Sequence, residues 1–346
     1  MTSTVVQSSV TYPLPKSTLE TRRSTIVPVH DDRRPLTTGN LDLRDISPEG
    51  DLAEGAPQQS LYYASPRAWL YCGDATDVLT TLNTASVDCI VTSPPYYGQR
   101  DYGVAGQLGL EDHPQEYINK LIAVFRQARR VLKPTGSLWV NLGDTYWSGK
   151  GRPHGKDAKQ KARRFTRPQD KAGERPLCQP KQLLLIPHRF AIAMQDEGWI
   201  VRNDNVWRKP RPTPDPVRDR SAASHEYVFH FVTQRKYYYD YSAVSVPSTG
   251  QAKRQAPSSV WDIPTVPSQK EHTAVFPPDL ALLPVRATCP PDGVFLDPFC
   301  GSGTALTAAL CQGQGRQVIG IDISAQALVE AQEHVVVAQR PDERRS

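Results

Sequence analysis

Four residues at the end of a predicted strand have the types and the spacing to hold a flat amine. The string Ser-Pro-Pro-Tyr occupies residues 93–96 and follows a largely apolar run over 87–92. Each proline fixes its own backbone φ, lacks an N–H donor, and pushes the preceding residue into an extended conformation. The segment therefore cannot continue as a helix, and its hydroxyl and carbonyl oxygens can accept hydrogen bonds from an exocyclic amino group. A plain Pro-Pro turn is the alternative that these four residues leave open.

A second loop, near the end of the chain, has the composition of a ligand cradle. The string Asp-Pro-Phe-Cys-Gly-Ser-Gly-Thr occupies residues 297–304, between an apolar pair at 295–296 and an apolar helical stretch at 305–310. Glycines let a ligand approach the backbone, and the start of a helix presents free N–H groups. A further predicted strand, 317–322, ends in Asp322, whose carboxylate suits ribose hydroxyls. A dinucleotide is the rival ligand, but the loop lacks the full G-x-G-x-x-G pattern and opens with an acid that suits a cation better than a pyrophosphate.

Together the two loops resemble those of the amino-methylating DNA methyltransferases, which use S-adenosylmethionine. The matching motifs are Ser-Pro-Pro-Tyr and Asp-Pro-Phe-x-Gly-Ser-Gly-Thr, and the resemblance extends over residues 68–338. The catalytic loop comes first and the cofactor loop last, which is similar to the β arrangement of that family. Serine at the first position resembles the N4-cytosine members, whereas adenine-N6 members more often carry aspartate there.

The resemblance implies roles for individual residues. The catalytic residues are Ser93, Pro94, Pro95 and Tyr96. The cofactor-binding residues are Asp74, Phe276, Pro277, Asp297, Phe299, Gly301, Gly303, Thr304 and Asp322. Asp297 would lie near the sulfonium, Asp322 at the ribose and Asp74 near the adenine. Structural explanations stay open for three of these residues, because Asp74 and Thr304 can cap helices and Phe276 can belong to the core.

The implied reaction is direct methyl transfer to an exocyclic amine, without a covalent enzyme–base intermediate. Hydrogen bonds from the amine to the Ser93 hydroxyl and the Pro94 carbonyl would favour a more pyramidal nitrogen, so the reaction needs alignment more than a strong base. A paired base has to flip out of the duplex to react. The candidates for base stacking or DNA contact are Tyr96, Tyr97, Arg100 and Trp207. Core packing is an equal alternative for Trp207, and Tyr97 can instead pack beneath the loop.

Charge is concentrated in one stretch of the chain. Residues 148–175 carry ten Lys or Arg and three Asp or Glu, a net charge of +7, against +5 for the whole chain. Such runs are usually solvated loops. In a chain with a base-modifying loop we expect phosphate contacts instead, from Lys159, Lys161, Arg163 and Arg164. Double-stranded DNA is therefore the expected partner.

The cysteines and the apolar stretches of the chain indicate where in the cell the protein acts. The six cysteines form no C-x-x-C pair, so we predict no metal site. No apolar stretch approaches the length of a membrane span, and the N-terminus lacks the apolar core of a signal peptide. We therefore expect a cytoplasmic protein of a bacterial cell, associated with the nucleoid, as a monomer or homodimer.

Strands and helices are predicted to alternate. Strands are expected at 69–72, 86–92, 137–142, 199–207, 225–232 and 317–322, with another leading into Asp297. Helices are expected at 76–82, 115–132, 183–197, 276–287, 305–310 and 325–338. This order predicts an α/β fold with a doubly wound and mostly parallel sheet. The resemblance implies that the sheet is Rossmann-like, of the S-adenosylmethionine-dependent methyltransferase type, with permuted motif order and inserted DNA-recognition segments. Ligands bind such sheets at the carboxyl ends of the strands, where both loops lie.

Composition, together with the resemblance, divides the chain into seven segments. They are a flexible N-terminal arm (1–60), the catalytic half of the methyltransferase domain (61–144), a basic insertion (145–180), a continuation of the domain (181–232), a target-recognition segment (233–270), the cofactor-binding half (271–338) and a charged tail (339–346).

The sequence thus predicts a site-specific DNA methyltransferase that acts on the N4 amine of cytosine in duplex DNA. Restriction–modification or host DNA protection would be its setting, with a cognate restriction endonuclease as a separately acting partner. Three alternatives stay open: the same fold acting on adenine N6, an RNA or protein methyltransferase, and a DNA-binding module without activity.

Overall fold

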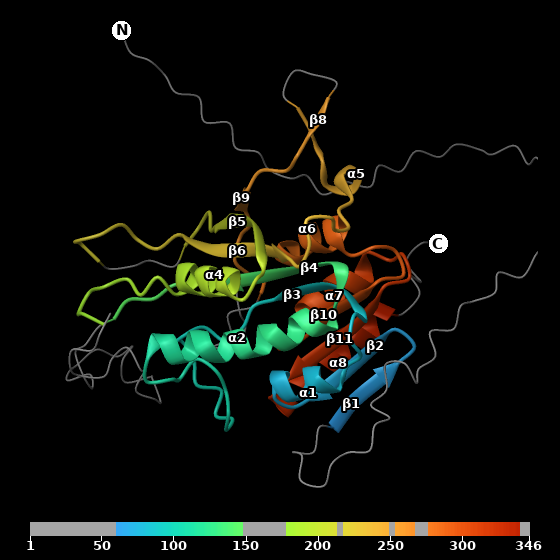
Figure 1. Ribbon diagram of the computed structural model, residues 1–346, viewed down its shortest axis with the longest axis horizontal. Coiled ribbons are helices and arrows are strands. Elements are labelled where there is room, and N and C mark those ends of the chain that lie inside the picture. Colours follow the sequence, from blue (N-terminus) through green and yellow to red (C-terminus); the bar gives the residue numbers. More distant parts are fainter. Residues whose placement is uncertain (1–59, 148–177, 213–216, 249–252, 267–275, 340–346) are drawn as a thin grey trace, which may run out of the picture.

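The computed structural model describes residues 60–147, 178–212, 217–248, 253–266 and 276–339, and the four lysine and arginine residues expected to contact phosphates lie outside these ranges (Figure 1). The strands of its main sheet are β1 (Ser60–Ser65), β2 (Ala68–Cys72), β3 (Val87–Thr92), β4 (Leu132–Leu142), β5 (Ile200–Arg208), β6 (His225–Val232), β9 (Val260–Asp262), β10 (Val294–Asp297) and β11 (Gln317–Asp322). The helices are α1 (Ala75–Thr81), α2 (Pro114–Val131), α4 (Ile186–Asp196), α5 (Tyr241–Val244), α6 (Pro278–Thr288), α7 (Thr304–Cys311) and α8 (Ala325–Gln339).

The nine strands form one sheet in the order β1-β2-β11-β10-β3-β4-β6-β5-β9. Strands β2, β11, β10, β3 and β4 are parallel to one another, while β1 and β6 run antiparallel to their neighbours β2 and β4. From β10 the chain passes through α7 to β11 on one side, and from β3 it passes through α2 to β4 on the other. The point between β10 and β3 is therefore where the winding reverses, and α/β sheets bind ligands outside such a point.

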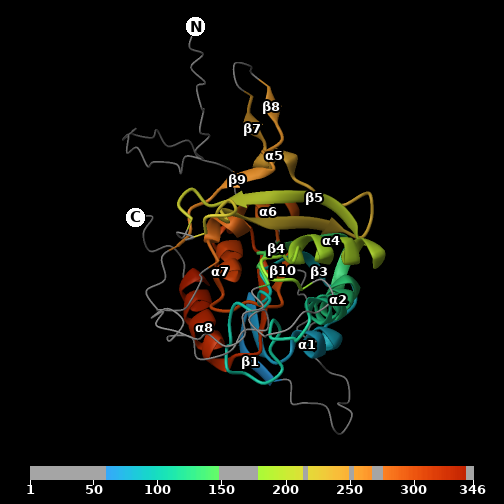
Figure 2. The same ribbon diagram turned by 90° about the vertical axis from the view of Figure 1, so that its left-hand side faces the viewer.

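Helices cover both faces of the sheet, as the doubly wound prediction requires. Helices α1, α2 and α4 lie on one face and α6, α7 and α8 on the other (Figure 2). Strand β3 is buried along its whole length, because Ile90 packs into the core on the α2 side while Cys89 and Val91 pack into the core on the α6 side. A strand buried on both faces appears as a nearly unbroken apolar run, which is why the sequence alone predicts β3.

Several predicted boundaries move. Helix α4 begins at Ile186 rather than at residue 183, because Leu185 has a positive φ of 56°, outside the right-handed helical region. Strand β4 begins at Leu132, directly after α2, where a loop over 133–136 was expected. Leu132 pairs with Val87 of β3, so the strand begins before Pro134.

Two strands of the main sheet were not predicted. Strand β1 lies next to the N-terminal arm and pairs antiparallel with β2. Strand β9 lies within the segment 233–270 and pairs with β5 through Val206 and Val260. Both are short edge strands, so their residues show no sustained alternation. The segment 233–270 therefore contributes to the main sheet as well as to the small pair β7 (Val246–Pro247) and β8 (Arg254–Gln255), which projects from the body beside α5 (Figure 2).

Among the described residues, no helix is both long enough and apolar enough to cross a membrane.

Candidate functional site

The two loops meet at the carboxyl ends of adjacent strands. Strand β10 pairs with β3 through Phe295 with Cys89 and Leu296 with Ile90. Just beyond that pairing, the Thr92 hydroxyl donates a hydrogen bond of 2.6 Å to Asp297 Oδ1, and both side chains are buried. The loop that begins at Ser93 and the loop that begins at Asp297 are thus tied together, as the sheet prediction required.

The side of the site that holds the glycine loop is built on Asp322, the last residue of β11. Its Oδ2 accepts a 2.8 Å hydrogen bond from the Gly301 N–H, and its Oδ1 accepts one of 2.8 Å from the Ser324 N–H. Its backbone carbonyl accepts from the Gly73 N–H at 3.0 Å. Asp322 therefore joins the glycine loop to the end of β2. Asp74, next in the chain after Gly73, caps α1 by accepting from the Thr76 N–H at 2.8 Å, so its structural explanation is confirmed.

Two glycines shape the loop in different ways. Gly303 has φ +76°, and a Cβ added there would lie 3.1 Å from the Cα and Cβ of Ala331 in α8, so the residue allows close packing of the loop on that helix. Gly301 has φ +51° and open space where a Cβ would stand. The open side of the loop is therefore at Gly301. Gly303 is the residue that precedes α7 at its N-terminus, and Thr304 provides no side-chain cap, so the capping explanation for Thr304 is wrong.

The acids of this region are poised for a cation. Burial raises the pKa of the Asp297 carboxyl to about 7, even though it accepts hydrogen bonds from Thr92 and from the Phe299 N–H. Burial also raises the pKa of Asp322. A positive charge bound beside these carboxyls would favour their ionised forms. In the absence of such a charge, burial favours the protonated forms of both carboxyls.

Phe276 and Pro277 lie at the start of α6. Pro277 is buried and precedes the first helical residue, and Phe276 is partly buried against the core on the α6 side. Helix α6 leads into β10 through a short connection. Because that connection joins the end of α6 to the start of β10, the first residues of α6 lie toward the edge of the sheet where the loops meet. Both residues are therefore on the expected edge, with Phe276 in contact with the core as well.

The catalytic loop is anchored beneath its second proline. The Tyr117 hydroxyl of α2 donates a 2.7 Å hydrogen bond to the Pro95 carbonyl, and the Gly98 N–H donates one of 2.6 Å to the Gly109 carbonyl. No hydrogen bond to the Pro94 carbonyl is formed within the described part of the chain. The Pro94 carbonyl oxygen can therefore accept a hydrogen bond from a ligand, whereas the Pro95 carbonyl oxygen anchors the loop to α2.

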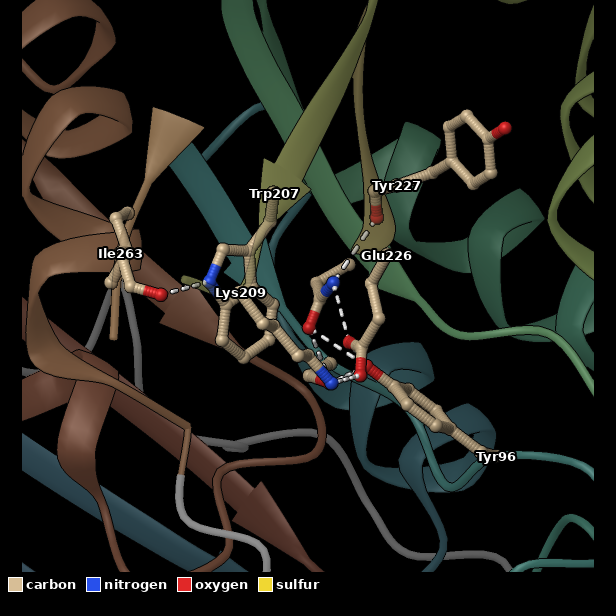
Figure 3. A network of polar contacts seen from close by, with 8 residues as sticks. Tyr96, Trp207, Lys209, Glu226, Tyr227 and Ile263 are labelled. Atoms are coloured by element: carbon tan, nitrogen blue, oxygen red, sulfur yellow. Dashed lines mark hydrogen bonds and ion pairs between the residues drawn. The ribbon is translucent and has the colours of Figure 1, made fainter. Parts of the chain in front are cut away.

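Beside this loop, a polar cluster connects the loop to β4 and β6 (Figure 3). The Tyr96 hydroxyl lies 2.8 Å from Asn141 Oδ1 and 2.5 Å from Glu226 Oε2. Ser93 Oγ lies 3.3 Å from the same Asn141 oxygen. Lys209 forms an ion pair with Glu226. Burial and the Glu226 carboxylate raise the pKa of Tyr96 well above its ordinary value, so Tyr96 keeps its hydroxyl proton.

Two of the expected stacking residues are not available to a base. The Trp207 indole is buried, donates a 2.8 Å hydrogen bond to the Ile263 carbonyl, and has the Lys209 ammonium 4.7 Å from its ring centre (Figure 3). Tyr97 is buried beneath the loop, with its ring centre 5.6 Å from that of Tyr117. The stacking role is therefore wrong for both, and their alternatives in the core are confirmed. Tyr96 remains partly exposed, and Arg100 lies partly exposed on the loop that follows.

Sequence reasoning missed four residues of this site, namely Thr92, Asn141, Lys209 and Glu226. A signal existed for Asn141, which is the only polar residue in the apolar run 138–142 that ends at a glycine. Glu226 carried no such signal, because a single acid near the start of a strand is common. Only the pairing of β4 with β6, which places Leu142 opposite Tyr227, brings the two together.

Comparisons with known proteins agree with this arrangement. The family model described as DNA methylase, for N6 and N4 methyltransferases, matches residues 87–333. The chain is 43% identical over 256 residues to the type II methyltransferase M.XycI of Xanthomonas campestris pv. cyanopsidis, and the match covers 74% of this chain and 83% of that relative.

Solved structures share the fold. The PvuII DNA methyltransferase, described as cytosine-N4-specific, has a TM-score of 0.59 at 19% identity, with coverage of 83% of this chain and 91% of that one. A putative DNA modification methylase from Thermus thermophilus, complexed with S-adenosyl-L-methionine, has a TM-score of 0.52 at 24% identity, with coverage of 79% and 93%. The Rossmann-like methyltransferase fold is thereby confirmed. Since the family match spans most of the described residues and the identity to M.XycI is high, the chain belongs to the DNA methylase family of N6 and N4 methyltransferases and is a DNA methyltransferase of the restriction–modification type.

Proposed function

We propose that this chain transfers a methyl group from S-adenosyl-L-methionine to the N4 amine of cytosine, on a base flipped out of duplex DNA. The observation that carries the proposal is the position of Ser93 and Pro94 directly after β3, tied through Thr92 to Asp297 at the end of β10. Hydrogen-bond acceptors suited to an amine and a carboxyl group suited to a cation therefore lie side by side.

The residues of the glycine loop fit this cofactor. The open side of Gly301 leaves room beside the backbone, and Asp297 and Asp322 offer carboxylates to a positive charge and to ribose hydroxyls. When bound, the cofactor supplies an electrophilic methyl group on a sulfonium. Asp74, Phe276, Pro277 and Phe299 would complete the cradle at the same edge of the sheet.

The catalytic loop would act on the amine nitrogen. The Ser93 hydroxyl and the Pro94 carbonyl accept hydrogen bonds from the two N–H groups of the amine. These bonds draw the nitrogen out of conjugation with the ring and free its lone pair. Alignment of that lone pair with the methyl group is the main requirement, because holding two reactants in place removes much of the barrier. Tyr96, fixed at its hydroxyl end, presents its ring to the flipped base.

Phosphate contacts would come from the basic insertion, whose four expected lysine and arginine residues lie outside the described ranges, and from Arg100 beside the catalytic loop. A cognate restriction endonuclease would act separately on the same sequence. DNA as the substrate would associate the enzyme with the nucleoid.

The test is a product analysis. We would incubate the purified chain with duplex DNA and S-adenosyl-L-methionine, digest the DNA, and separate the nucleosides by mass spectrometry. N4-methylcytosine is the expected product, and the Ser93→Ala variant is the matched control that should form far less of it. N6-methyladenine without N4-methylcytosine would show that the same site serves adenine instead.

A further inference from the structure

Ser93 stands at the open end of a polar cluster whose deeper members take no part in the mechanism above. The cluster consists of Ser93, Tyr96, Asn141, Glu226 and Lys209 (Figure 3). Its residues come from the catalytic loop, from the end of β4, from the start of β6, and from the residue that follows β5. The inference concerns what these hydrogen bonds do to the Ser93 hydroxyl, and it rests on the proposed function.

The amide of Asn141 can take only one orientation. Its Nδ2 donates to the Tyr227 carbonyl at 3.1 Å and to Glu226 Oε2 at 3.2 Å. A backbone carbonyl and a carboxylate have no hydrogen to give, so both must face the NH₂ group. Asn141 is 2% exposed, so solvent has little access to replace these bonds. Its Oδ1 is therefore turned toward Ser93 and Tyr96 and can only accept from them.

Lys209 keeps Glu226 in its role as an acceptor. The ammonium pairs with Glu226 Oε1, and the two side chains are 22% and 13% exposed. An ion-paired carboxylate offers acceptor oxygens only. The one Tyr96 hydroxyl hydrogen is shared between Glu226 Oε2 at 2.5 Å and Asn141 Oδ1 at 2.8 Å, so none is left for Ser93 and the Tyr96 oxygen presents a lone pair toward it.

Both neighbours of the Ser93 hydroxyl are thus acceptors. Ser93 Oγ lies 3.3 Å from Asn141 Oδ1 and 3.4 Å from the Tyr96 oxygen, and it has one hydrogen to donate. These contacts are longer than the usual hydroxyl bond, so Ser93 can tighten them when a ligand arrives. We propose that Asn141 and Glu226 act as positioning residues that draw the Ser93 hydrogen into the cluster and leave its lone pairs for the target base.

This polarity selects the chemical class of the base. An amine in the position of cytosine N4 finds an acceptor in Ser93 and another in the Pro94 carbonyl. A carbonyl in the same position, as in uracil, meets two acceptors and no donor. A buried polar group left without its partner weakens binding by roughly five- to more than a hundredfold. Asn141 and Glu226 therefore determine selectivity between amine and carbonyl, although neither touches the base.

Glu226→Gln tests the inference, because Lys209 orients the new amide. The ammonium needs an acceptor, so the amide oxygen faces Lys209 and its NH₂ group takes the place of Oε2. That group then opposes the NH₂ of Asn141 and donates to Tyr96. With a donor at residue 226, the Tyr96 hydrogen turns to Asn141 Oδ1 or to Ser93, so fewer acceptors hold the Ser93 hydrogen and it is released toward the base.

The measurement compares two duplexes that differ only at the target position, identified beforehand by mapping modified bases in a host that expresses the chain. One carries cytosine and the other uracil, both opposite an abasic site so that neither is paired. Dissociation constants are measured with S-adenosyl-L-homocysteine bound. The wild type should favour cytosine by about tenfold or more, and Glu226→Gln should reduce that ratio at least severalfold. A wild type without preference, or a variant with an unchanged ratio, would overturn the inference.

A double variant separates polarity from packing. When Asn141→Asp is combined with Glu226→Gln, the new carboxylate on β4 accepts from Ser93 and from the new amide on β6, so acceptors again face Ser93. We expect the cytosine preference to recover relative to Glu226→Gln alone. A double variant that is less selective than Glu226→Gln would show that the cluster acts only by packing. Glu333→Gln, on the exposed face of α8, is the matched control and should keep the wild-type ratio.

Failure of the proposed function would be distinguishable from failure of this inference. If product analysis reveals N6-methyladenine, the same comparison is made with adenine and hypoxanthine, which differ in the same way between an amine and a carbonyl. A ratio that responds to Glu226→Gln would then support the inference although the cytosine assignment had failed. N4-methylcytosine together with a ratio that does not respond would retain the function and overturn the inference.

Discussion

At the scale of single residues, the proposed function assigns the target base to Ser93 and the cofactor to Asp297. Ser93 lies at the end of β3 and is partly exposed, whereas Asp297 lies at the end of β10 and is buried. The sequence predicted both residues from the local strings around them. The burial that raises the pKa of Asp297 comes from the neighbouring strands, so the local string could not predict it.

Ser93→Ala should lower turnover and leave cofactor binding unchanged. The substitution removes an acceptor for the amine, and loss of one such contact in a preorganised site costs about 10²–10³ in kcat. Single-turnover methylation measures the rate, and calorimetry measures the dissociation constant of S-adenosyl-L-methionine. An equal loss in both would place Ser93 in the cofactor cradle instead.

The raised pKa of Asp297 predicts that cofactor binding depends on pH. Its pKa of about 7 means that the carboxyl is largely protonated below neutral pH, while a bound sulfonium favours the ionised form. Affinity for the cofactor should therefore rise as pH increases through about 7. Asp297→Asn should bind more weakly and lose this dependence. A wild-type affinity that stays constant across the pH range around 7 would contradict the assignment.

The raised pKa of Asp297 also predicts how the stability of the ligand-free protein depends on pH. A carboxyl whose pKa rises from 3.8 to about 7 on folding stabilises the fold below pH 3.8 and loses that contribution as pH rises through about 7. Asp297→Asn, which cannot ionise, should therefore gain stability relative to the wild type as pH rises from 3.8 to about 7. Thermal unfolding without ligand at both ends of this range measures the difference, and an identical difference at the two ends would rule out the buried carboxyl as its source.

At the scale of elements, the glycine loop depends on the helix that packs against it. Helix α8 contacts the loop at Ala331 and through His334, whose Nδ1 lies 2.8 Å from the Ser302 carbonyl oxygen. The loop conformation is thus supported by α8 as well as by the local glycines. Prediction of the strand, turn and helix was correct for this unit because each signal is local.

Gly303→Ala should destabilise the fold more than Gly301→Ala does. Both residues have positive φ, and strain of this kind costs about 1–3 kcal/mol. At Gly303 the added methyl group also meets Ala331, whereas at Gly301 it enters open space. Denaturant unfolding compares their stabilities, and calorimetry should show that Gly301→Ala loses more cofactor affinity than stability. Equal destabilisation would mean that the contact with α8 contributes nothing.

At the scale of the whole molecule, the described residues form the sheet and the helices that cover it, and the basic stretch over 148–175 lies outside them. In the sequence, residues 148–175 fall between β4 and α4. The segment expected to read the target sequence, 233–270, supplies β9 to the main sheet. This segment is therefore part of the main sheet, and its role in recognition stays a prediction.

Neutralising Lys159, Lys161, Arg163 and Arg164 together to glutamine should weaken DNA binding and flatten its salt dependence. Each lost phosphate contact reduces the slope of log K against log salt by about 0.9. Exchanging lysine and arginine at the same four positions keeps the charge and is the matched control. Fluorescence anisotropy over a range of salt concentrations measures the slope, and a slope that is equal in the two variants would leave the stretch as a solvated loop.

Proline, glycine and unbroken apolar runs act on the backbone where they stand, so the mostly parallel sheet, the two loops and their places at strand ends could be predicted from the amino-acid sequence. The burial of Trp207 and Tyr97 could not be predicted in this way, and neither could the position of Asn141 and Glu226 around Ser93 and Tyr96. Those contacts depend on the register between β4 and β6, and each strand alone shows only which of its residues share a face. The hydrogen-bond polarity of Ser93 is thus a property of the assembled sheet and not of the four residues that contain it.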